Sequence, residues 1–141
     1  MYIKLTNGQP EVYTVGQLHR DNPQTSFPRH TPEELLAEYG VYTCARPEYP
    51  IFDWRTSRVV DGEFYQDASG GWFQSYVVEN LSQDEAERNV RSHRDSLLQQ
   101  TDWMALSDNT ITPENAAYRQ ALRDITTQEG FPYNVVWPTK P

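Results

Sequence analysis

Residues 82–101, SQDEAERNVRSHRDSLLQQT, are the stretch that decides how this chain folds. Ser82 and Glu85 have the spacing of a capping box, in which two side chains bond the free backbone N–H groups at a helix start. The residues that follow at helical spacing are Ala86, Val90, His93, Leu97 and Leu98. The pattern predicts a helix of roughly 20 residues that ends by Thr101.

A second helix is predicted downstream. Thr112, Pro113 and Glu114 form a typical helix start. One apolar face follows, made of Ala117, Tyr118, Ala121, Leu122 and Ile125, and Gly130 ends the pattern. The prolines at 132, 138 and 141 exclude further helix. We therefore expect a helical hairpin followed by an extended tail rich in proline and tryptophan.

Upstream of residue 81 the pattern favours strands. Residues 2–5 and 12–15 read as a hairpin around the turn Asn7-Gly8, with Pro10 placing the second strand at a sheet edge. Thr31-Pro32-Glu33-Glu34 predicts a capping box that opens one short helix, ended by Gly40. Residues 41–44 form a plausible further strand.

Three strand-like runs follow, at residues 51–60, 63–66 and 72–78. Asp61-Gly62 and Gly70-Gly71 lie between them as predicted turns, which indicates an antiparallel meander. The fold class expected is thus α+β. Residues 1–80 should form a small antiparallel β lobe with one short helix, and residues 81–141 the helical hairpin and tail.

Composition excludes several classes of function. The net charge of −8 and the lack of a basic patch argue against nucleic acid as a partner. No apolar run approaches the roughly 18–20 residues that span a bilayer, so no membrane contact is expected. Cys44 is the only cysteine, and neither a disulfide nor a thiolate cluster can form, which favours a reducing compartment. We expect a soluble protein without a signal peptide.

No catalytic constellation is visible. His19, His30 and His93 are scattered, without the spacing of metal ligands. Cys44 lacks a nucleophile signature and is expected to be a small buried residue. Since no carboxylate pair or phosphate-binding loop stands out, we predict no enzyme, no metal, no cofactor and no small-molecule substrate.

Trp103 and the pair of arginines on the second helix each have two alternative interpretations. Trp103 either packs between the two helices or contacts a partner protein. Arg119 and Arg123 lie four residues apart on one face, so both could reach Asp95 or Asp102 across the hairpin. Alternatively, a guanidinium group holds a partner chain through its forked hydrogen bonds.

The C-terminal tail is the preferred contact. Its aromatics either dock back on the helix pair or grip a partner, because a proline-stiffened segment loses little entropy on binding. Val135, Val136 and Trp137 could lie along an exposed sheet edge of that partner. The candidate partner-binding residues are Trp103, Arg119, Arg123, Phe131, Pro132, Val135, Val136, Trp137 and Pro138.

The same residues carry a family resemblance. From about residue 90 to 141 the chain resembles the tail assembly chaperone family of tailed bacteriophages, the tail fibre assembly proteins, and more weakly so from about residue 71. The resemblance rests on a series of positions in order and spacing: Arg94, Leu97-Leu98, Thr101-Asp102-Trp103, Asp108, Tyr118-Arg119, Ala121-Leu122-Arg123-Asp124, Gly130-Phe131-Pro132, Trp137-Pro138 and Pro141.

The resemblance implies a non-enzymatic helper that binds a tail fibre protein, expected to be trimeric, and assists its folding or trimerisation. Such a protein would act in the host cytoplasm during assembly, and an alternative is that it also stays in the virion tail. A different class of function is a carbohydrate- or cell-wall-binding module of a phage tail. The residues that suggest this alternative are the aromatics Trp54, Trp72, Phe73 and Tyr76.

Overall fold

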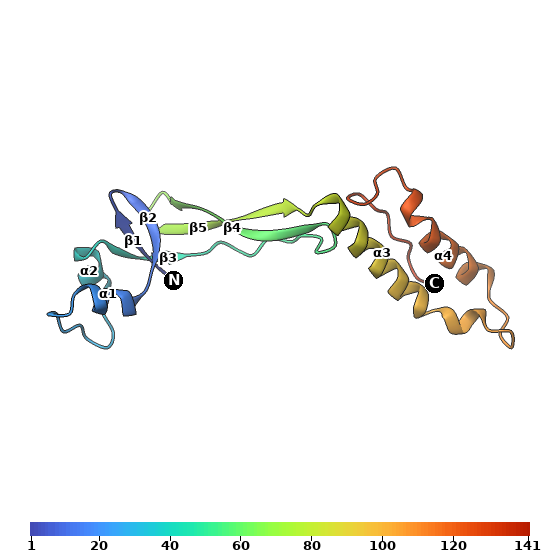
Figure 1. Cartoon of the computed structure of the whole chain (residues 1–141), viewed down its shortest axis with the longest axis horizontal. Helices are drawn as coiled ribbons and strands as arrows, with labels where there is room; N and C mark the ends of the chain where they lie inside the picture. The colour runs from blue at the N-terminus through green and yellow to red at the C-terminus, as the bar shows by residue number, and fades with distance from the viewer. The chain divides into compact units, whose positions relative to one another are not determined.

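The computed structural model describes residues 1–141 as a mixed α+β protein, which confirms the predicted class (Figure 1). Its strands are β1 (Tyr2–Thr6), β2 (Gln9–Tyr13), β3 (Val41–Ala45), β4 (Ser57–Gln66) and β5 (Trp72–Asn80). Its α-helices are α1 (Val15–Asp21), α2 (Glu33–Glu38), α3 (Gln83–Gln99) and α4 (Pro113–Arg123). Two short 3₁₀ helices, η1 (Asp102–Ala105) and η2 (Asp124–Thr127), follow α3 and α4.

The chain forms two compact units. The first contains Met1–Pro50 and Val59–Val77, and the second contains Ile51–Arg58 and Val78–Pro141. Strands β4 and β5 therefore each contribute residues to both units. The division into two domains at residue 80 stays a prediction.

The sheet has the strand order β2-β1-β3-β5-β4. Strand β1 runs antiparallel to both β2 and β3, where Tyr2 is the partner of Tyr13 and of Thr43. Strand β3 instead runs parallel to β5, with Cys44 opposite Trp72. The sheet is thus mixed, and the prediction of a purely antiparallel lobe is wrong. Residues 46–71, which include β4, form the long connection that parallel neighbours need.

The first hairpin confirms the turn prediction but ends early. Asn7 and Gly8 have φ of 52° and 79°, as the tight turn requires. Strand β2 stops at Tyr13, and Thr14 then caps α1 through a capping box with Gln17. The predicted strand to Val15 and the prediction of a single helix are both wrong. Burial of Leu18, which is fully enclosed, outweighs the poor helix propensity of the first turn.

Helix α2 is confirmed, but its start differs from the prediction. The N-cap is Pro32, and no side chain caps this helix. The Thr31 hydroxyl instead donates to the carbonyl of Pro28 at 3.2 Å, so the predicted capping box does not form. The core of this unit consists of Tyr13, Leu18, Phe27, Leu36 and Val41.

Strand β4 replaces two predicted strands. Asp61-Gly62 lies inside it rather than at a turn. A Cβ atom on Gly62 would fall 2.3 Å from Ser75 Oγ and 3.0 Å from Val77 Cγ2, so this glycine allows close approach to β5. The second predicted turn is confirmed, because Gly70 has φ of 85° between β4 and β5.

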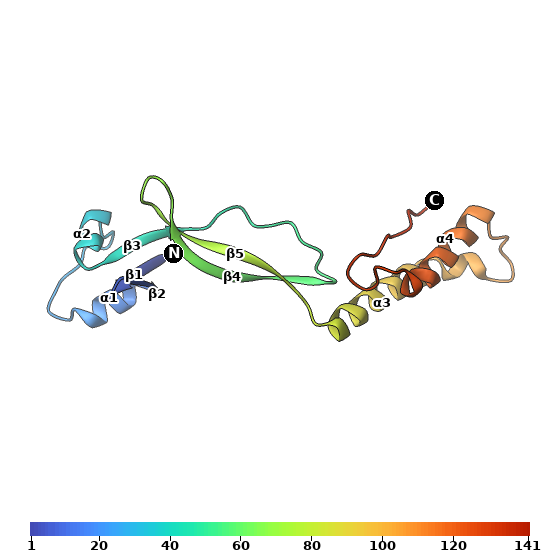
Figure 2. The same ribbon diagram turned by 90° about the horizontal axis from the view of Figure 1, so that it is seen from above.

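The second unit is built on α3 and α4, which lie side by side (Figures 1 and 2). The capping box of Ser82 and Glu85 is present, and Thr112 caps α4, so both predicted helix starts are confirmed. Residues 129–133 form turns, and residues 135–141 have no regular secondary structure. The core of this unit consists of Val90, Tyr118, Leu122 and Ile125. None of the helices is long and apolar enough to span a bilayer.

Candidate functional site

The C-terminal segment turns back onto its own helices. The Asn134 N–H donates to the carbonyl of Gly130 at 2.7 Å, and a Cβ on Gly130 would meet Asn134 O at 2.3 Å. The peptide between Phe131 and Pro132 inside this turn is cis. Phe131 within the turn, and Val135 and Trp137 past it, pack against the core of the second unit. The alternative in which the tail docks on the helix pair is thus the one that the structure shows.

Gln128 holds the segment through both polar groups of its side chain. The Val136 N–H donates to Gln128 Oε1 at 2.8 Å, and Gln128 Nε2 donates to the Val136 carbonyl at 2.9 Å. In addition, the Tyr133 hydroxyl donates to the carbonyl of Leu81 at 2.8 Å. The backbone groups of Val136 are therefore already paired, although its side chain is 77% exposed.

Trp137 lies in an aromatic and cationic cluster. The Arg55 guanidinium carbon lies 4.8 Å from the Trp137 ring centroid, and the His93 ring meets the same indole edge-on at 4.7 Å. The Trp54 ring also meets His93 edge-on, at 5.9 Å between centroids. Arg55 is itself fixed by Asp53, which accepts from Arg55 Nε at 2.7 Å. Residues of two other chain segments, 53–55 and α3, thus hold the indole in place.

The cluster shifts two ionisation equilibria. Burial, followed by the nearby positive charge of Arg55, lowers the pKa of His93 below its usual value. The hydrogen bond from Arg55 lowers the pKa of Asp53. Folding therefore favours the neutral imidazole of His93 over its charged form.

Arg119 ties the end of α3 to α4. Its side chain is buried and donates to the Leu98 carbonyl at 3.1 Å, to Thr101 Oγ1 at 2.6 Å and to Asp102 Oδ1 at 2.9 Å. The expected pairing of Arg119 with Asp102 is confirmed. Arg123 is exposed and makes no ion pair, so the same expectation for Arg123 is wrong. Of its two expected partners, Asp102 pairs with Arg119 and Asp95 accepts from Arg94 Nε at 2.8 Å.

Trp103 lies on η1 and is 58% exposed, so the expectation that it packs between the helices is wrong. Leu106, close by in the chain, is 55% exposed. The carbonyl of Trp103 accepts from Asn109 Nδ2 at 2.9 Å, which fixes the loop that follows. A hollow of about 170 Å³ lies beside it, lined by Trp103, Met104, Asn109, Thr110, Ile111, Thr112 and Asn115.

The candidate partner-binding residues thus differ in how accessible they are. Arg119 and Pro132 are buried, whereas Trp103, Arg123 and Val136 are exposed. The half-buried members of the set are Phe131, Val135, Trp137 and Pro138. Binding of a partner by any of the nine stays a prediction.

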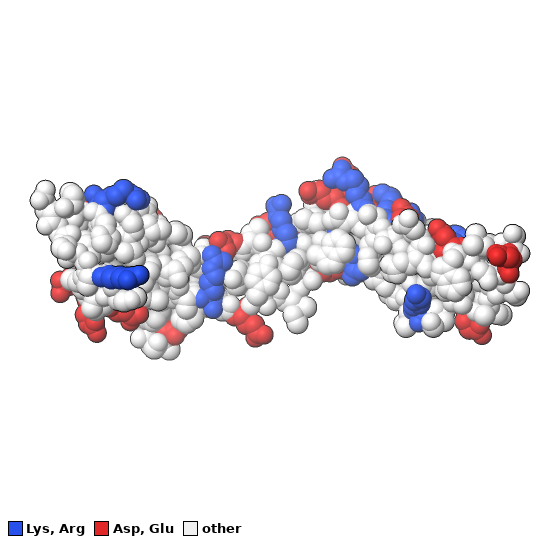
Figure 3. All heavy atoms as spheres, turned by 90° about the horizontal axis from the view of Figure 1, so that it is seen from below, with Lys and Arg blue, Asp and Glu red and all other residues white.

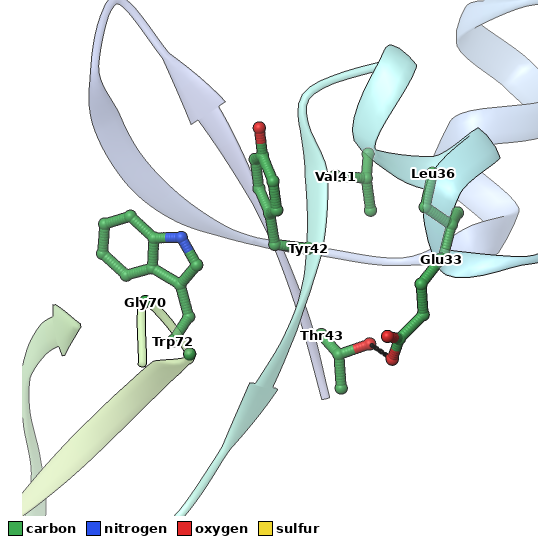
Figure 4. A pocket seen from close by; sticks show the side chains of 8 residues that line it. Glu33, Leu36, Val41, Tyr42, Thr43, Gly70 and Trp72 are labelled. Carbon is green, nitrogen blue, oxygen red and sulfur yellow. Dashed lines mark hydrogen bonds between the residues drawn. The ribbon is translucent and has the colours of Figure 1, made fainter. Parts of the chain in front are cut away.

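The first unit has a pocket of about 180 Å³ (Figure 4). Trp72 from β5 and Tyr42 from β3 line it together with Glu33 of α2. Thr43 Oγ1 donates to Glu33 Oε1 at 2.9 Å, as the dashed line in Figure 4 shows. The sequence indicated Trp72 as a candidate binding residue but not Tyr42 or Glu33. Only the parallel pairing of β3 and β5 brings these segments together.

Charged and thiol side chains are the groups that would hold a metal ion or a polyanion. No three His, Cys, Asp or Glu side chains are grouped so that they could hold a metal ion. Cys44 is buried, as expected, and burial raises the pKa of its thiol. On the face drawn in Figure 3, basic and acidic side chains are interspersed, without a large area of positive charge.

The geometry defines an α+β protein whose second unit packs an aromatic C-terminal segment onto a helix pair. Residues 87–141 match the model of a family described as phage tail assembly chaperone protein. The match covers most of α3, all of α4 and the C-terminal segment, and it confirms the family resemblance of this part of the chain. Comparison with curated proteins and with solved structures gave no match.

Proposed function

We propose that this protein is a non-enzymatic assembly chaperone that binds a tail fibre protein of a tailed phage and assists its folding and trimerisation. The match of residues 87–141 to the tail assembly chaperone family is the observation that carries the proposal. The match also supports action in the host cell while the virion is assembled. Whether the protein then leaves or stays on the finished tail distinguishes two forms of the same proposal.

The physical task explains why a small binding protein would suffice. Fibre chains that await trimerisation expose strand edges and apolar surface, both of which promote aggregation. A protein that covers those surfaces keeps the chains separate without consuming ATP. Its own net charge of −8 favours solubility of the complex.

Co-expression with the fibre protein of the same phage tests this proposal. We expect soluble trimeric fibre when both proteins are made, a stable complex on size-exclusion chromatography, and aggregated fibre when this protein is omitted. Soluble, trimeric fibre made in its absence would contradict the proposal.

The exposed candidate contacts can be tested in the same system. We propose that Trp103 and Val136 contact the fibre chain, whereas Phe131 and Trp137 mainly position the segment that carries Val136. Trp103→Ala and Val136→Ser should each weaken the complex, with little change in the unfolding temperature. Ile51→Ser is the matched control, because Ile51 is fully exposed and lies outside the family match. If all three variants bind the fibre protein equally well, neither Trp103 nor Val136 contacts it.

The pocket beneath Tyr42 and Trp72 favours one alternative function. Aromatic rings stack on the apolar faces of sugars, and the Glu33 carboxylate can accept hydrogen bonds from hydroxyl groups. A carbohydrate-binding module would bind specific sugars on a glycan array, and Glu33→Gln would weaken that binding. Absence of any glycan signal would contradict this alternative, and the chaperone proposal would be the one that stands.

A further inference from the structure

The hairpin of β4 and β5 contributes no apolar side chain to either core. Both hydrophobic clusters are formed by residues before position 45 or after position 85. Between these positions, only the polar residues Thr56 and Gln74 are buried. The hydrophobic effect, which stabilises most sheets, therefore acts weakly on the two longest strands of this protein.

The same hairpin leaves large apolar side chains partly in water. In the part that belongs to the first unit, Tyr65 is 42% and Val77 44% exposed. Strand β3 pairs with β5 only at Cys44 and Ala45. A two-stranded hairpin is marginally stable alone in water, and further strands or a packed face are needed to stabilise it. An additional strand from another chain would supply both.

Strand β4 offers an edge for such a strand. It is the last strand of the sheet, and its ten residues include neither proline nor lysine. Of its charged side chains, which can also protect a sheet edge, Arg58 and Asp61 are bound within the chain by Glu79 and Arg46. A hollow of about 340 Å³ borders Glu63 and Phe64 of β4. Its other border is formed by Gln9 and Pro10 of β2, the opposite edge strand of the sheet. An extended segment that pairs with β4 would occupy this hollow.

Charge indicates which kind of segment fits. Residues 45–50 and 59–77 carry one cation, Arg46, and four carboxylates, which gives a net charge of 1 − 4 = −3. Arg46 is already bound by Asp61 through two hydrogen bonds of 2.5 and 3.1 Å. Asp67 accepts N–H groups of its own turn, from Ser69 and Gly71. The Glu63 carboxylate, at the hollow, has no cation partner and is free to pair with a lysine or arginine.

We propose that β4 is the docking edge for an extended segment of the tail fibre chain, which alternates apolar side chains with a Lys or Arg that faces Glu63. The inference rests on the proposed function and names the surface that would perform it. Main-chain hydrogen bonds along β4 supply affinity, and the apolar side chains cover Tyr65 and Val77. The surface lies outside the residues that match the family model.

Charge reversal at the edge tests the inference. The wild-type protein and its variants are titrated with the purified fibre protein of the same phage by isothermal titration calorimetry. Glu63→Lys should raise Kd about tenfold or more, since it replaces an attraction with a repulsion. Glu38→Lys is the matched control, because Glu38 is an exposed carboxylate of the same unit without an ion pair, and it should change Kd less than about twofold. Unchanged circular dichroism establishes that both variants fold.

Hydrogen exchange separates failure of this inference from failure of the proposed function. In the wild-type complex, the amides of residues 59–66 should exchange more slowly than in the free protein. A complex that leaves these amides unprotected, or that forms equally well with Glu63→Lys, overturns the docking edge but keeps the chaperone proposal. If the wild-type protein does not bind the fibre at all, both proposals fail.

Discussion

Arg119 stabilises the fold, although the sequence alone was also compatible with a role in binding a partner. Arg119 is 7% exposed, and its guanidinium group donates to a carbonyl, a hydroxyl and a carboxylate at the end of α3. A buried arginine of this kind has little freedom to reach a second protein. Its contribution to assembly would be indirect, through the placement of η1 and the exposed Trp103.

Replacement of Arg119 should therefore destabilise the second unit. Arg119→Ala leaves the buried Thr101 hydroxyl and the Leu98 carbonyl without this donor, at a cost of about 3 kcal/mol in the free energy of unfolding. Urea denaturation followed by tryptophan fluorescence measures this loss. Arg123→Ala is the control and should cost less than about 0.5 kcal/mol, since Arg123 is exposed and unpaired. Similar losses in both variants would contradict the assigned role.

His93 should make stability depend on pH. Because its pKa is lowered in the folded protein, the unfolded state binds the proton more tightly than the folded state. This contribution to stability is present above pH about 6.5, the usual pKa of histidine, and falls as the pH decreases toward the lowered value. Denaturation midpoints measured between pH 5 and 8 report the effect. In His93→Gln the denaturation midpoint should depend less on pH. An equally strong pH dependence in the variant would show that another group causes it.

At the scale of elements, three capping motifs had three different outcomes. The motif at Ser82 forms as predicted, the one at Thr14 was missed, and the one at Thr31 does not form. The Thr14 motif precedes Val15 and Gly16, which are poor helix formers, so local propensity hides it. The Thr31 hydroxyl finds a different acceptor, Pro28. A local motif can thus mark a helix whose capping bond does not form, and poor helix propensity can hide one that does.

The confirmed cap of α3 should have a measurable effect. Ser82→Ala removes the hydroxyl that accepts from the Glu85 N–H and donates to Glu85 Oε2 at 2.7 Å, which should lower the free energy of unfolding by about 1 kcal/mol. Ser92→Ala in the middle of the same helix is the control, where alanine should stabilise slightly. Chemical denaturation compares the two variants. A Ser82→Ala protein as stable as the wild type would show that the capping box is dispensable.

At the scale of the whole molecule, two separate cores should respond independently to mutation. Leu18 and Leu122 are fully buried, one in each hydrophobic cluster. Leu18→Ala and Leu122→Ala should each cost about 3 kcal/mol, through lost burial and the cavity left behind. Residues that share no partners have additive effects, so the coupling energy should stay below about 0.5 kcal/mol. Hydrogen exchange of the variants, resolved by segment, measures each unit separately, and a large coupling energy would contradict independence.

The sequence by itself determined the α+β class, both main helices and the family resemblance of the C-terminal part. These features depend on local information, because capping residues, apolar spacing and the series of side chains shared with the family all lie close together in the chain. The tertiary structure alone decided where strand β5 is inserted, which residues cover the C-terminal segment, and why Gly62 lies in a strand. Each of these depends on contacts between residues far apart in the chain, such as Cys44 with Trp72 and Arg55 with Trp137. Local propensity contains no information about such contacts, because pairing and packing partners are selected by the whole fold.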